Sequence, residues 1–318
     1  MERIIGRYEG IEKGTLLICL GSIHGNEPAG TKALELMFKM LEVEPITNPS
    51  FNFKGRLLGL RGNLRAIQAG KRYLEKDLNR QWTVTNVNRV LQTDITKLVA
   101  EDLEIRELMD LINKEIAAYQ PEKIVLLDLH TTTAFGGIFT VVTDDPESLK
   151  IGIELHAPVI RGLLKGIKGT SLHYFKEENI GIPTTAVCFE SGQHDEQLSI
   201  NRAIAAITNC MRTIGCVQAE DVENQHDKLL MEFSEGLPKV SQLIMTHPIK
   251  ERDEFVMQPG YKNFQRVKKG EVVADDKKGP IQIVKDGLLL MPLYQKQGDD
   301  GFFLIESVDI EFGLENQK

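Results

Sequence analysis

The sequence is poor in the features that mark secreted and membrane proteins. It contains four cysteines in 318 residues, and no apolar run reaches the ~18 residues that a membrane-spanning helix needs. Cys19, Cys188, Cys210 and Cys216 are widely spaced without a CxxC motif, so we expect reduced structural thiols. The first residues, MERIIGRYEGIEKG, include no apolar segment of the signal-peptide type. These absences predict a cytoplasmic protein without a membrane partner.

Positive charge is also scarce. Lysine and arginine number 38 against 46 aspartates and glutamates, which gives a net charge of −8. No basic stripe is present, which argues against a nucleic-acid partner. A negative chain attracts anions poorly over long distances, so a few local arginines must hold any anionic substrate. A homo-oligomer is compatible with the sequence, which does not fix the oligomeric state.

Short apolar runs alternate with amphipathic helical patterns over the first three quarters of the chain. Strands are expected at 15–20, 53–60, 124–129, 137–143 and 184–189, and helices from residue 27, over 101–119 and after Gly192. This order predicts an α/β fold for residues 1–235, with a mainly parallel mixed sheet flanked by helices. Residues 236–318 show only short strand patterns broken by Gly and Pro, which predicts a small C-terminal all-β domain.

Metal-binding side chains follow two of the expected strands. His24 and Glu27 lie in the turn after 15–20, and His130 closes the strand 124–129. Ligand sites in open α/β sheets form at the carboxyl ends of strands. Imidazole and carboxylate suit zinc, and a catalytic zinc usually has three protein ligands. Asp128 points to the same side as His130 and is placed to accept the spare ring N–H of that histidine. A surface loop is the alternative for the His-x-x-Glu pair, and a buried core histidine is the alternative for His130.

A further carboxylate, Glu190, ends the strand 184–189. Beside a catalytic metal, such a group takes a proton from the attacking water and returns it to the leaving nitrogen. The alternative is a glutamate that favours the N-terminus of the next helix.

Two segments between the metal-ligand candidates offer arginines for anions. Arg65 lies in Asn-Leu-Arg-Ala after the strand 53–60, and Asn79-Arg80 ends Asp-Leu-Asn-Arg. Arginine binds carboxylates through two parallel hydrogen bonds, and it stabilises a developing oxyanion. A solvated arginine without a role is the alternative at both positions.

The ordered motifs HGNE, NLRA, DLNR, DLH and FESG resemble the succinylglutamate desuccinylase/aspartoacylase family, whose core is similar to that of the zinc carboxypeptidases. The resemblance implies one zinc per chain on His24, Glu27 and His130, with Glu190 as general acid/base. It implies Arg65 near the scissile carbonyl, and Asn79 with Arg80 on a substrate carboxylate. It also implies a small N-acyl amino acid with a free carboxylate as the substrate, and a C-terminal β domain over the active-site mouth.

The chain departs from aspartoacylases just before the catalytic glutamate. Aspartoacylases have a second carboxylate-binding arginine there, whereas HYFKEENIGIPTTAVCFE contains none. Tyr174 is the candidate substrate-binding residue in its place, and Lys176 is the alternative. Two other functions stay open, a zinc carboxypeptidase acting on short peptides and a metal-binding module without catalysis.

Overall fold

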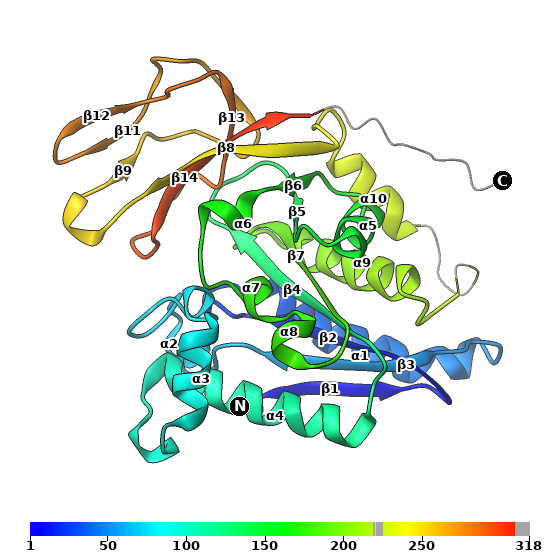
Figure 1. The fold of residues 1–318 in the computed structure, drawn as a ribbon. Helices are drawn as coiled ribbons and strands as arrows, with labels where there is room; N and C mark the ends of the chain where they lie inside the picture. The colour runs from blue at the N-terminus through cyan, green and yellow to red at the C-terminus, as the bar shows by residue number, and fades with distance from the viewer. Residues whose placement is uncertain (219, 221–224, 309–318) are drawn as a thin grey trace.

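The computed structural model describes residues 1–218, 220 and 225–308, and an 11-stranded sheet runs through the molecule (Figure 1). In sheet order, its strands are β1 (Ile4–Glu9), β3 (Lys54–Arg61), β2 (Glu12–Gly21), β4 (Ile124–Thr132), β7 (Thr184–Gln193), β5 (Phe139–Val142), β6 (Val159–Arg161), β8 (Val240–Pro248), β14 (Asp300–Ser307), β13 (Gly287–Leu290) and β10 (Gln265–Val267). The pairs β3–β2, β2–β4, β4–β7, β5–β6 and β6–β8 are parallel. β1 and β5 run antiparallel to β3 and β7. The mixed, mainly parallel sheet confirms the predicted fold class.

Helices cover both faces of the sheet. Successive side chains of a strand point to opposite sides, so an apolar strand has apolar side chains to bury on each face. Leu16, Ile18 and Leu20 of β2 join a core cluster with α4 (Ala100–Tyr119). The intervening Leu17 and Cys19 join a second cluster with α1 (Ala29–Thr47) and α9 (Leu198–Thr213). Every residue of β4 is buried, as expected for a strand covered on both faces.

The other helical segments are shorter and lie mostly in the connections. They are α2 (Leu64–Ala69), η1 (Leu78–Arg80), α3 (Val84–Gln92), η2 (Ile95–Lys97), α5 (Pro146–Glu154), α6 (Leu163–Gly166), α7 (Ser171–Tyr174), α8 (Glu177–Ile180), α10 (Gln225–Phe233) and η4 (Glu251–Asp253). Within the described residues, no helix has the length and apolar character to cross a membrane.

The C-terminal part is built from β-strands and has its own core. β8, β14, β13 and β10 extend the main sheet, and β12 (Gly279–Gln282), β11 (Val272–Asp276) and β9 (Val256–Met257) form a second, antiparallel sheet. Met257, Val273, Leu289, Phe302 and Leu304 are among the buried residues of this core. The expected boundary at 235/236 falls between α10 and β8. The parallel pairing of β6 with β8 carries the main sheet across that boundary, so residues 236–318 as a separate domain stay a prediction.

Candidate active site

The three predicted metal ligands meet at the carboxyl ends of β2 and β4. These strands are parallel neighbours, so the β2–α1 turn with His24 and Glu27 lies beside His130 of β4. The three side chains are almost completely buried. One ligand atom from each lies within 4.8 Å of the ligand atoms of the other two. The turn needs Gly25, because a Cβ there would lie 2.2 Å from the Ala66 carbonyl carbon.

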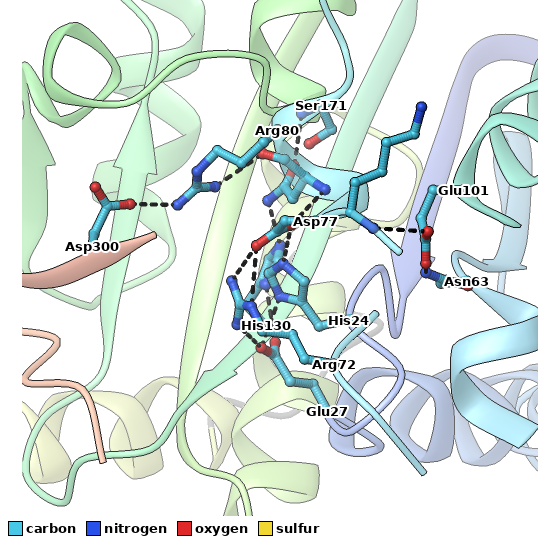
Figure 2. A network of polar contacts seen from close by, with 12 residues as sticks. His24, Glu27, Asn63, Arg72, Asp77, Arg80, Glu101, His130, Ser171 and Asp300 are labelled. Atoms are coloured by element: carbon cyan, nitrogen blue, oxygen red, sulfur yellow. Dashed lines mark hydrogen bonds and ion pairs between the residues drawn. The ribbon is translucent and has the colours of Figure 1, made fainter. Parts of the chain in front are cut away.

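Each histidine ring is held at both nitrogens by carboxylates. Nδ1 of His24 lies 2.8 Å from Glu27 Oε1, and its Nε2 lies 3.0 Å from Asp77 Oδ1 (Figure 2). Nδ1 of His130 lies 3.0 Å from Glu27 Oε2, and its Nε2 lies 3.3 Å from Asp128 Oδ2. A carboxylate on the outer ring nitrogen fixes the tautomer and orientation of a ligand histidine. Both rings turn Nδ1 toward Glu27. Asp128 lies beside the outer nitrogen of His130, as the alternation of side chains along the strand predicts.

The donor set fits a zinc ion, since two imidazole nitrogens and one carboxylate converge in a buried place. Burial alone would raise the pKa of Glu27, but the two histidines outweigh it and hold that pKa well below the usual range. Asp77 behaves in the same way, because Arg72 and His24 outweigh its burial and lower its pKa. Both carboxylates are therefore ionised in the folded protein.

Glu190 lies next to this cluster on β7. The parallel register pairs it directly with His130, so both side chains lie on the same face of the sheet. Glu190 is buried, and its Oε2 has no hydrogen-bond partner among residues 1–218, 220 and 225–308. Burial raises the pKa of Glu190 to about 8. A group with a pKa near neutrality is suited to taking up and releasing a proton at physiological pH.

Arg72 also lines the cavity beside the two histidines, although no motif in the sequence marks it. Its Nε and Nη2 donate to Asp77 Oδ2 at 3.1 and 3.0 Å, and its Nη1 donates to Glu27 Oε1 at 3.3 Å (Figure 2). Its carbonyl oxygen accepts from the N–H of Gly25 at 3.0 Å. The loop that contains Arg72 and Asp77 is therefore tied to the metal-ligand turn.

Arg65, which the resemblance places near the scissile carbonyl, lies elsewhere. Its guanidinium donates to Glu104 at 2.6 Å and to Glu107 at 2.8 Å, and both glutamates belong to α4. It does not line the cavity that contains His24, His130 and Glu190, whereas Arg72 does. The physical reason is that Arg65 lies in the first turn of α2, where Glu104 and Glu107 of α4 bind its guanidinium.

Asn79 and Arg80 lie in the cavity wall, where the sequence predicts a carboxylate site. The Asn79 Oδ1 accepts from the N–H of Ser171 at 2.9 Å. Nη1 of Arg80 donates to the Asn79 carbonyl at 2.9 Å, and Nη2 donates to Asp300 Oδ2 at 2.6 Å. Figure 2 shows Arg80 reaching from the η1 segment to this aspartate.

Tyr174, the expected substitute for the missing arginine, packs in the core. Its ring lies 6.0 Å from that of Trp82 and 5.8 Å from that of Phe175, measured between centroids. It does not line the active-site cavity.

The cavity has two parts that share His24, His130, Arg72, Arg80, Glu190, Met291 and Phe303. The part we call the polar chamber adds Thr131–Thr133, His194, Gln295, Asp299 and Asp300 among its lining residues. The part we call the apolar chamber adds Val141, Leu163, Leu164, Ile167, Leu172 and Cys188, with Asn79 and Thr170. A groove of about 650 Å³ shares Leu164 and Leu172 with the apolar chamber, but none of the metal-ligand candidates lines it.

Residues 13–214 match the Succinylglutamate desuccinylase/Aspartoacylase catalytic domain family. The chain belongs to this family. A curated relative, a probable aspartoacylase of Nostoc sp. strain PCC 7120, is 33% identical over 133 residues. That match spans 42% of this chain and 40% of the relative, so it reaches less than half of either protein.

Solved structures of the family share the fold over most of the chain. A succinylglutamate desuccinylase from Vibrio cholerae has a TM-score of 0.62 at 18% identity, covering 93% of this chain and 82% of its own. A succinylglutamate desuccinylase/aspartoacylase from Rhodobacter sphaeroides has a TM-score of 0.61 at 15% identity, covering 93% and 87%. These likenesses extend through the C-terminal strands, beyond the matched catalytic domain.

The site loop depends on Glu101, a fully buried carboxylate of α4. It accepts from the N–H groups of Leu74, Glu75 and Lys76 at 2.7, 3.1 and 3.2 Å, and from the Asn63 side chain at 3.1 Å. Replacing one carboxylate oxygen by an amide group turns an acceptor into a donor that faces other donors. Glu101 therefore fixes the path of the loop between Arg72 and Asp77.

We expect Glu101→Gln to destabilise the protein by about 1–3 kcal/mol, because buried N–H groups lose their acceptor. Amide hydrogen exchange at residues 74–76 should become faster in this variant. Asp110→Asn, which removes an exposed carboxylate of the same helix paired with Arg106, is the matched control and should change neither quantity. Unchanged exchange at residues 74–76 in Glu101→Gln would contradict the assigned role.

Proposed function

We propose that the protein is a zinc-dependent amidohydrolase that removes the acyl group from a small N-acyl amino acid with a free carboxylate. The observation that supports this most is the convergence of His24, Glu27 and His130 beside the unpartnered Glu190 carboxyl, at a cavity wall that contains Arg80. The family membership agrees with the proposal, since the named relatives are a desuccinylase and a probable aspartoacylase. The four buried free cysteines support a cytoplasmic location.

The metal ligands are assigned to His24, Glu27 and His130, one zinc per chain. A zinc ion held there would supply Lewis-acid activation of the amide carbonyl and of water. The protein itself supplies the orientation of the ligands, through Asp77 on His24 and Asp128 on His130.

The proton transfers are assigned to Glu190. Its free Oε2 is placed to take the proton of the attacking water, and the same carboxyl then gives a proton to the leaving nitrogen. The pKa of about 8 that burial gives this group matches a role in which it must both gain and lose a proton.

Arg72 is assigned to the developing negative charge on the amide oxygen. Its Nε and Nη2 donate to Asp77, and its Nη1 points toward Glu27, the carboxylate assigned to the metal. A guanidinium fixed in this way is a preorganised donor, and such donors stabilise an oxyanion without further rearrangement. Arg80, with Asn79 behind it, is assigned to the substrate carboxylate.

The rival function is that of a zinc carboxypeptidase for short peptides, which needs an open groove for the rest of the peptide. Here the C-terminal segment lines the cavity with Met291, Leu293, Asp299, Asp300 and Phe303, among others. A wall on this side favours small substrates over peptides.

The proposed function predicts hydrolysis of N-acyl amino acids by the zinc-loaded protein, in a screen over acetyl, formyl and succinyl groups alongside short peptides. Glu190→Gln should retain zinc but lose ~10²–10⁴-fold in kcat, because general acid/base groups contribute on that order. Faster turnover of peptides than of acyl amino acids would favour the rival function. Near wild-type kcat in Glu190→Gln would refute the role of the glutamate.

Arg72 and Arg65 provide a direct comparison of the two arginines. We expect Arg72→Ala to lower kcat/KM by about 10²-fold or more, as for the loss of an oxyanion donor. Arg65→Ala should leave kcat/KM within about threefold, because its partners Glu104 and Glu107 lie outside the cavity. The ranking would be reversed if Arg65 were the residue beside the scissile carbonyl.

A further inference from the structure

We propose that the amino-acid half of the substrate has an apolar side chain, which occupies the apolar chamber, and one carboxylate, which binds Arg80, and that Asp300 excludes a second carboxylate. This inference rests on the proposed deacylase function.

The part of the apolar chamber that is not shared with the polar chamber offers nothing to a second negative charge. Its residues include no charged side chain, and the two arginines of the cavity, Arg72 and Arg80, line both chambers. The Asn79 amide is engaged by Ser171 and faces His130, and the Thr170 hydroxyl contacts the His173 ring at 2.7 Å. An unpaired carboxylate buried there would lose its hydration without compensation. An apolar side chain would remove its own surface and that of Leu164 and Ile167 from water.

Asp300, which lines the polar chamber, also disfavours a second carboxylate on the substrate. Its ion pair with Arg80 is largely shielded from solvent, with side-chain exposures of 11% and 19%. Arginine has five N–H donors, and Asp300 and the Asn79 carbonyl use two of those of Arg80. The remaining donors suffice for one carboxylate of the substrate. A second one would meet Asp300 and Asp299 in the polar chamber, where like charges repel each other.

The test measures kcat/KM for the leucine, asparagine, aspartate and glycine derivatives of whichever acyl group the wild-type protein hydrolyses fastest. We expect the leucine derivative to exceed the aspartate derivative by about tenfold or more, since a hydrophobic pocket distinguishes such groups by at least that factor. Asparagine and aspartate have nearly the same shape, so their ratio isolates the effect of charge.

Asp300→Asn should raise the aspartate-to-asparagine ratio by about tenfold or more, because it removes the negative charge beside Arg80. Glu306→Gln is the matched control. It neutralises a carboxylate of the same strand that pairs with Lys285 at the surface, and it should leave the ratio unchanged. If Asp300→Asn only loosened the packing of the C-terminal strands, kcat/KM would fall equally for the aspartate and asparagine derivatives, and their ratio would stay the same.

Ile167→Ala should lower the leucine-to-glycine ratio by about tenfold, because the truncated wall loses contacts that only the longer side chain makes. Ile180→Ala truncates another partly buried isoleucine, which packs on the same core cluster but does not line the apolar chamber. It should leave this ratio unchanged. An unchanged ratio in Ile167→Ala would overturn the assignment of the chamber to the side chain.

Wild-type preference for the aspartate derivative, or an unchanged aspartate-to-asparagine ratio in Asp300→Asn, would overturn the inference and leave the deacylase function standing. Absence of hydrolysis for every acyl amino acid would instead overturn the proposed function. If Asp300→Asn fails to fold, product inhibition of the wild-type protein answers the question. Leucine should then inhibit about tenfold more strongly than aspartate, and equal or weaker inhibition by leucine would contradict the inference.

Discussion

The buried carboxylate of Glu27 holds the active site together. It contacts His24 and His130, accepts from the N–H of Thr131 at 3.1 Å and pairs with Arg72. A buried charge is tolerated only when it is paired and hydrogen-bonded, and removal of a partner leaves the other groups uncompensated. Glu27 therefore fixes the end of β2 against the end of β4, and the remaining parts of the site are arranged around this junction.

The parts come from distant segments of the chain, each fixed by its own buried contacts. Glu101 holds the loop that presents Arg72 and Asp77, and β7 places Glu190 through its register with His130. The C-terminal strands add the outer wall with Asp300. In the proposed function, the sheet edge carries the chemistry, whereas substrate selection is divided between the apolar chamber and Asp300 of the C-terminal wall.

The sequence predicts most of the sheet and the four residues at its edge, because apolar runs mark buried strands and their polar ends converge in a parallel sheet. It does not predict that β5 runs antiparallel to β7, since the apolar pattern of a short strand is the same for either direction. It also does not separate Arg65 from Arg72. Both lie in the same connection, and only the packing of α2 on α4 shows which one Glu104 and Glu107 bind. Asp300 lies 220 residues from Arg80 in the chain, so no local sequence pattern could predict that the two residues form an ion pair.

The account is tested most directly by the metal dependence of turnover. Protein stripped with a chelator should lose N-acyl amino acid hydrolysis and recover it on addition of one equivalent of zinc. His130→Ala should bind zinc at least about tenfold more weakly and should not recover at that concentration. Full activity of the stripped wild-type protein, or recovery of His130→Ala with one equivalent of zinc, would contradict a catalytic metal on His24, Glu27 and His130.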